Sequence, residues 1–120
     1  MAYSEHLADR VRARLSHLPG VQEKRMMGGL VFLLGDKMCL GVDIDKSTGW
    51  DRLMVRVGKL PYESLLKRPG SRPMDFTGRV MRGFLFIDPS GFDAEEDLDF
   101  WTEKALEFNK MLRSGQMTND

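Results

Sequence analysis

Arginines gathered in the middle of the chain are the side chains best suited to chemistry. Residues 46–82 hold nine basic side chains against three acidic ones. A guanidinium group binds phosphate or carboxylate through paired hydrogen bonds, so this segment suits nucleic acid or a phosphorylated small molecule. The binding candidates are five arginines and one aspartate of this segment, Arg52, Arg56, Arg72, Asp75, Arg79 and Arg82.

An acidic segment at the end of the chain suggests an alternative role for the same arginines, which is to pair with carboxylates of this protein. Residues 88–120 hold nine acidic side chains against three basic ones, and the formal net charge of the chain is zero. The balance favours mutual neutralisation of the two segments, because nucleic-acid binders usually carry net positive charge. Asp75 is interpreted in the same way, as a loop carboxylate that ties down Arg72 and Arg79.

A pair of glycines, Gly28 and Gly29, follows Arg25 and resembles a loop that could cradle phosphate. A phosphate loop leads into a helix, whose N-terminus receives the anion, whereas this pair lies between two predicted strands. We therefore interpret the pair as the bend of a β-hairpin, where glycine permits positive φ. Arg25 beside it remains a candidate for binding a carboxylate or phosphate.

Metal and thiol chemistry find little support. His6 and His17 lie eleven residues apart on one predicted helix, about 16 Å at 1.5 Å per residue, too far to share one metal ion. Cys39 is the sole cysteine, and the sequence places no histidine beside it as a base. We expect no catalytic residue, no metal and no cofactor.

The predicted elements are helices at both ends and strands between them. Leu7, Val11, Leu15 and Leu18 form one apolar stripe of a first helix capped by Ser4. Strands are predicted over residues 21–27, 30–34, 38–45, 52–57 and 80–87, a short helix over 61–66, and a loop over 68–73.

The last helix has the cleanest periodicity in the chain. Asp93 and Glu96 match a capping box, and apolar side chains including Trp101 recur every three or four residues from 94 to 112. Together these segments predict an α+β fold in the order α-β-β-β-β-α-β-α. Its five-stranded, mostly antiparallel sheet carries the N- and C-terminal helices. In residues 38–45, alternation directs Cys39 and Asp43 away from the covered face.

Length and composition predict one domain over residues 1–120, with a disordered tail at 115–120. The lone cysteine cannot form an internal disulfide, and the N-terminus lacks the apolar stretch of a signal peptide. The longest apolar run, Leu30 to Leu34, is too short to span a membrane. We expect a cytoplasmic protein without membrane contact.

Five short motifs in a fixed order resemble the N-terminal domain of the TfoX/Sxy family, bacterial proteins named for regulators of natural competence. The resemblance covers about residues 5–112, and implies an α/β fold with a mostly antiparallel sheet. Full regulators of the family carry a second, C-terminal domain, and we expect this chain to be a stand-alone, single-domain member. The motifs are Arg25–Leu30, Lys37–Val42, Leu53–Gly58, Arg72–Arg79, and Met81–Phe84 with Trp101.

Two functions are therefore expected. The resemblance implies a non-catalytic regulatory module that binds a protein partner of unassigned identity. An open edge strand would also permit a homodimer. The alternative is binding of nucleic acid or a phosphorylated small ligand through residues 46–82.

Overall fold

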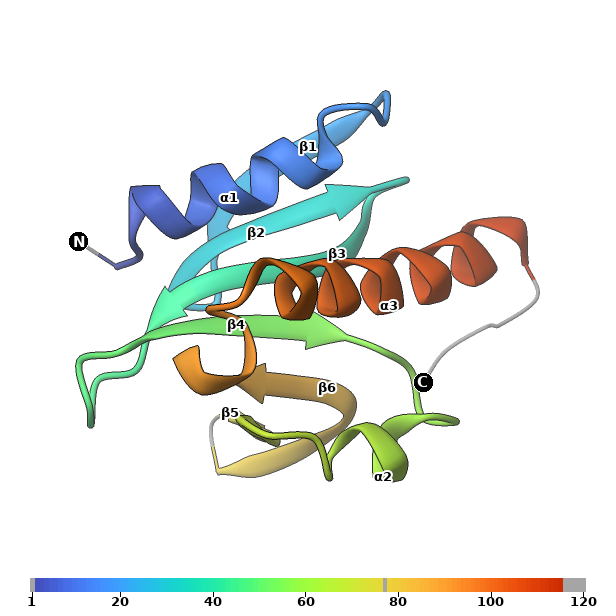
Figure 1. Ribbon diagram of the computed structural model, residues 1–120. Helices are drawn as coiled ribbons and strands as arrows, with labels where there is room; N and C mark the ends of the chain where they lie inside the picture. The colour runs from blue at the N-terminus through green and yellow to red at the C-terminus, as the bar shows by residue number, and fades with distance from the viewer. Residues whose placement is uncertain (1, 77, 116–120) are drawn as a thin grey trace.

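Two long helices lie on the same face of one antiparallel sheet (Figure 1). The computed structural model describes residues 2–76 and 78–115. In chain order the elements are α1 (Glu5–Leu15), β1 (Val21–Met26), β2 (Gly29–Leu34), β3 (Lys37–Ile44), β4 (Asp51–Arg56), α2 (Tyr62–Leu65), β5 (Ser71–Phe76), β6 (Arg79–Ile87), the 3-10 helix η1 (Pro89–Gly91) and α3 (Glu95–Ser114).

The sheet is a meander with a hairpin added at one side. Its strand order is β1-β2-β3-β4-β6-β5, and every neighbouring pair is antiparallel. The predicted α+β class, with terminal helices on a mostly antiparallel sheet, is confirmed. The described residues form six strands where five were predicted.

The additional strand, β5, replaces part of the loop predicted over residues 68–73. Pro73 lies within it, opposite Leu85 of β6. Because β5 is an edge strand, proline's missing N–H removes no bond from a second neighbour. The candidate Asp75 therefore lies on a strand and not in a loop.

The two long helices begin in different ways. The Ser4 hydroxyl accepts a hydrogen bond from the Leu7 N–H at 3.2 Å, which confirms the predicted cap of α1. The predicted capping box of α3 is wrong, because Ala94 occupies the N-cap position without a side-chain hydrogen bond. Three acidic residues in the first turn of α3 instead face the positive end of the helix dipole.

The main core lies between the helices and the sheet. Val11 of α1, Leu98 of α3 and Leu53 of β4 are among its fully buried side chains. Trp101 is 1% exposed, and its indole N–H donates to the Gly91 carbonyl at 3.1 Å. This bond satisfies the polar end of a large aromatic side chain while the ring fills the core.

A second, smaller apolar cluster occupies the opposite face of the sheet. Val31, Met54, Met74 and Phe86 are buried there. The face that the alternating pattern assigned to solvent is therefore partly filled by side chains of the sheet itself.

Cys39 contradicts the predicted alternation. The β2–β3 register shifts, so that Phe32 pairs with Leu40 while Leu33 pairs with Met38. Cys39 is the extra residue of this bulge, and it packs into the main core instead of facing outward.

The β1–β2 turn confirms the glycine-marked bend. Met27 and Gly28 have φ values of 56° and 78°, the signs required by a two-residue type I′ turn. Gly29 has a different role, because a Cβ there would lie 2.7 Å from the Cβ of Asp43 and would also meet the Val42 carbonyl. Close approach of β2 to β3 therefore depends on Gly29.

Replacing each glycine by alanine should separate these roles. We expect Gly29→Ala to destabilise the protein by about 2–3 kcal/mol, because the methyl group must push β2 and β3 apart. Gly28→Ala should lose only about 1 kcal/mol, since its surroundings are open and only its φ is unfavourable. Urea unfolding measures both; equal losses would contradict the close-packing role of Gly29.

Candidate functional site

Arg52 of β4 faces Asp43 of β3 across the hairpin. Its Nε and Nη2 atoms donate to the two oxygens of Asp43 at 3.1 and 2.9 Å, a bidentate pair. Its Nη1 atom lies 3.4 Å from Asp45 Oδ2. Both aspartates are buried, so Arg52 is an internal partner of two carboxylates.

Arg72 of β5 joins the same network from the other side. Its Nε and Nη2 donate to Asp88 at 2.7 and 2.9 Å, and Nη2 also donates to Asp45 at 3.2 Å. The hydrogen bonds to Asp88 raise the pKa of the Arg72 guanidinium. The structure therefore brings together Arg52 and Arg72, which lie twenty residues apart in sequence.

Phe86 provides an aromatic surface for both guanidinium groups. The Arg52 Cζ atom lies 3.6 Å from the ring centroid, and that of Arg72 lies 5.8 Å away. Two arginines and three aspartates leave this network with a formal charge of minus one. An incoming phosphate would have to displace carboxylates that already occupy the donors.

The remaining arginine candidates of the basic segment lie elsewhere. Arg56 lies against the rings of Phe84 and Phe108, at 5.2 and 5.5 Å. Arg82 is exposed and pairs with Glu63 at 3.3 Å, a surface contact of small energetic value. Arg79 is exposed at the start of β6.

Asp75 does not hold the arginines that the sequence assigned to it. It is an exposed residue of β5, paired in register with Val80. Arg72 instead bonds to Asp88 and Asp45, so the predicted pairing of Asp75 with Arg72 is wrong. Whether any of these candidates binds a ligand stays a prediction.

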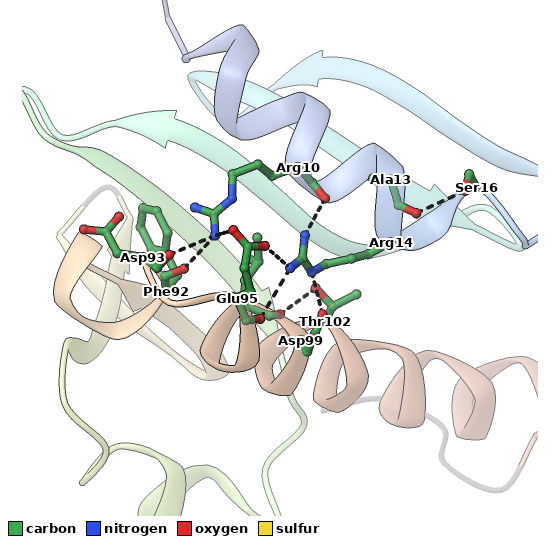
Figure 2. Close-up of polar contacts among 10 residues, drawn as sticks. Arg10, Ala13, Arg14, Ser16, Phe92, Asp93, Glu95, Asp99 and Thr102 are labelled. Carbon is green, nitrogen blue, oxygen red and sulfur yellow. Dashed lines mark hydrogen bonds and ion pairs between the residues drawn. The ribbon is translucent and has the colours of Figure 1, made fainter.

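The acids of α3 are neutralised mainly by α1 and not by the basic segment (Figure 2). Arg10 pairs with Glu95 at 3.0 Å, and Arg14 pairs with Glu95 and Asp99 at 2.5 and 2.7 Å. Figure 2 shows both guanidinium groups reaching from α1 to the start of α3. Arg68 of the basic segment also lies 4.0 Å from Asp97 of α3.

Arg25 lies at the far side of the sheet, on edge strand β1, away from the other candidates. Its guanidinium lies 5.8 Å from the ring centroid of Tyr3. Five of the six residues of β1, from Gln22 to Met26, are exposed. Arg25 and Lys24 form no ion pair with any other residue in the described part of the chain.

The candidates for nucleophilic and metal chemistry are the buried cysteine and the two histidines. Cys39 is 2% exposed, and burial raises the pKa of its thiol to about 12, so the thiolate is suppressed at neutral pH. No three His, Cys, Asp or Glu side chains within residues 2–76 and 78–115 are arranged to hold a metal ion. Over the same residues, no helix is both long and apolar enough to cross a membrane.

Sequence reasoning missed the aspartates that organise this network, Asp43, Asp45 and Asp88. The sequence did contain information that could have located Asp43. The predicted turn over residues 46–49 joins two strands into a hairpin, and in its register Asp43 lies opposite Arg52. Asp45 begins that turn and accepts hydrogen bonds from the backbone and hydroxyl of Ser47, at 2.9 and 2.8 Å. Asp88 carried no such signal, because its contact with Arg72 depends on the unexpected strand β5.

The antiparallel sheet, with both long helices on one face, defines an α+β domain. The family model of the TfoX N-terminal domain matches residues 13–109. The chain belongs to the TfoX N-terminal domain family, as the sequence motifs predicted.

A crystal structure of a protein from Pseudomonas syringae has a similar fold. It superimposes with a TM-score of 0.63 and 14% sequence identity, over 88% of this chain and 97% of that chain. At this identity the likeness shows the fold alone. No curated protein matches the sequence significantly.

The network should make stability depend on pH through Asp45. The Ser47 backbone N–H and hydroxyl, then the charges of Arg52 and Arg72, lower the pKa of Asp45 below its ordinary 3.8. A carboxyl group with a lowered folded pKa stabilises the fold above its unfolded pKa, and this contribution disappears as pH falls through the folded value. Stability should therefore fall with acidification below about pH 4.

Asp45→Asn tests this dependence. We expect a loss of about 1–2 kcal/mol at pH 7 and a shallower further loss between pH 4 and pH 2, measured by urea unfolding across the pH series. Asp75→Asn is the matched control, because Asp75 is exposed. An acid dependence as steep in Asp45→Asn as in the parent protein would contradict the assignment.

Proposed function

We propose that this chain is a non-catalytic binding module that acts through protein contacts in the bacterial cytoplasm, in the transcription regulation associated with competence. Membership of the TfoX N-terminal domain family supports a regulatory role. The suppressed thiolate of Cys39 and the internally bonded Arg52 and Arg72 argue against chemistry at those groups.

The observation that carries the proposal is the exposed edge strand β1. An edge strand presents unpaired N–H and C=O groups, which are a template for another strand. β1 is six residues long and contains no proline, whereas the opposite edge strand, β5, contains Pro73. β1 is therefore the better of the two edges for receiving a partner through main-chain hydrogen bonds.

A proline in β1 tests whether the partner pairs with this edge. Glu23→Pro removes one backbone donor, and Glu23→Ala is the matched control, because both variants lose the side-chain contact with Arg12. We expect immobilised Glu23→Ala to capture the same lysate protein as the parent domain, and Glu23→Pro to capture at least about tenfold less. Circular dichroism verifies that both variants are folded. Equal capture by the proline variant would contradict the proposed edge.

A second candidate function is binding of nucleic acid or a phosphorylated small ligand through residues 46–82. The exposed Arg79 and Arg82 on β6 favour it. The bonding of Arg52 and Arg72 to aspartates and the zero net charge speak against it.

Fluorescence anisotropy with single-stranded and duplex DNA across a salt series distinguishes the two functions. We expect no saturable binding even at low salt, where phosphate contacts are strongest. Arg56→Ala and Arg79→Ala serve as reference variants. Affinity that falls steeply with salt and is lost in Arg79→Ala would instead support the second function.

A further inference from the structure

The backbone groups of β1 point alternately toward β2 and away from the sheet. Met26 and Gly29 flank a two-residue turn, so they form the hydrogen-bonded pair that closes it. Because bonded and non-bonded pairs alternate, Val21, Glu23 and Arg25 direct their N–H and C=O groups outward. Within the described residues, no strand pairs with this outer side.

The same residues turn their side chains toward the helix-covered face. Glu23 is paired in register with Phe32 and Arg25 with Leu30, and both partners pack into the main core. Residues directly opposite each other in an antiparallel pair share a face. A strand added beside β1 would therefore set three of its own side chains on the helix side.

Two surface depressions lie at the ends of this outer edge. The depression near Val21 has a volume of about 350 Å³, and Leu15, Leu18 and Phe32 are among its lining residues. The depression near Arg25 also has a volume of about 350 Å³, and Tyr3 is among its lining residues. Four residues of extended chain separate Val21 from Arg25, about 14 Å, so alternate side chains of one peptide can reach both.

The charges along β1 indicate which side chain of an added strand each position of β1 favours. Glu23 is neutralised by Arg12, which holds both its oxygens at 2.8 Å. Arg25 has no carboxylate partner among the described residues and is positioned to receive one. The depression near Val21 offers apolar side chains instead.

We propose that β1 receives an extended peptide segment of a partner protein, paired antiparallel, with an acidic residue opposite Arg25 and an apolar residue opposite Val21. Read from its N-terminus, the segment carries the acid first and the apolar residue four positions later. This inference rests on the proposed function and specifies the partner chemistry for the same edge.

A second copy of this chain fits the edge less well. When two copies of β1 pair antiparallel about a two-fold axis, the helices of both copies lie on the same side of the joined sheet. The registers that align the most residues of the two strands are centred on Glu23 or on Lys24. The register centred on Glu23 sets that residue against its own copy and leaves Arg25 opposite Val21. The register centred on Lys24 places Glu23 opposite Arg25 but sets two lysines against each other. Neither register gives Arg25 a carboxylate without a like-charge contact, so a partner segment with an acid at that position fits the edge better than a second copy.

Fluorescently labelled synthetic peptides test the proposal against the intact chain at low ionic strength. The reference peptide carries glutamate and leucine four positions apart among threonines, with glycine and serine at its ends. One comparison peptide replaces glutamate by glutamine, and another moves leucine one position closer, which places the two side chains on opposite faces. We expect each change to weaken binding about 3- to 10-fold in anisotropy titrations.

Protein variants assign the effect to the edge. Arg25→Gln should bind the glutamate and glutamine peptides equally, whereas Lys24→Gln should keep the preference, because Lys24 lies on the other face. Glu23→Pro should bind every peptide at least about tenfold more weakly than Glu23→Ala. Equal binding of the spaced and shifted peptides, or an acid preference that survives in Arg25→Gln, would overturn the inference.

The outcomes also separate this inference from the proposed function. If capture of a lysate protein is sensitive to Glu23→Pro while the acid preference is absent, the edge binds a partner and only the peptide chemistry is wrong. If capture is unaffected by Glu23→Pro, the proposed function itself fails.

Discussion

The burial of Trp101 determines how the rest of this molecule is arranged. Its indole fills the main core and bonds to Gly91, which fixes α3 across β3 and β4. With α3 in that place, its acidic first turn lies beside α1 and is met by Arg10 and Arg14. The charge of the last helix is therefore used to join the two helices.

This arrangement changes the meaning of the basic segment. Counted along the sequence, the arginines of residues 46–82 and the acids of residues 88–120 appear to be natural partners. In space, the two segments meet at Arg72–Asp88 and Arg68–Asp97. Strand register decides the partner of Arg52, which lies opposite Asp43 in the neighbouring strand. A local excess of charge in sequence is thus not evidence of a charged surface when strands pair across it.

The sequence predictions succeeded where structure depends on neighbouring residues and failed where it depends on residues distant in sequence. α1, α3 and the first four strands were predictable, because apolar periodicity and turn residues act within a few positions. Three features could not be predicted from the sequence. Strand β5 contains Pro73, which a sheet tolerates only at an edge. The bulge at Cys39 depends on the fit between two strands, and the Asp45 network depends on side chains from several strands. Each depends on tertiary neighbours that no local pattern contains.

The two edge strands of the sheet are protected against indiscriminate pairing in different ways, and only one of these ways also permits selective binding. An exposed strand risks indiscriminate pairing, and natural proteins limit it with proline, bulges or charge. At β5 the device is Pro73 with a register shift. At β1 it is charge, and charge differs from proline because it repels some strands while attracting others. Lys24 opposes its own copy when two β1 strands pair about it, whereas Arg25 beside it can receive an acidic segment. Protection and selectivity therefore arise from neighbouring charges on one strand.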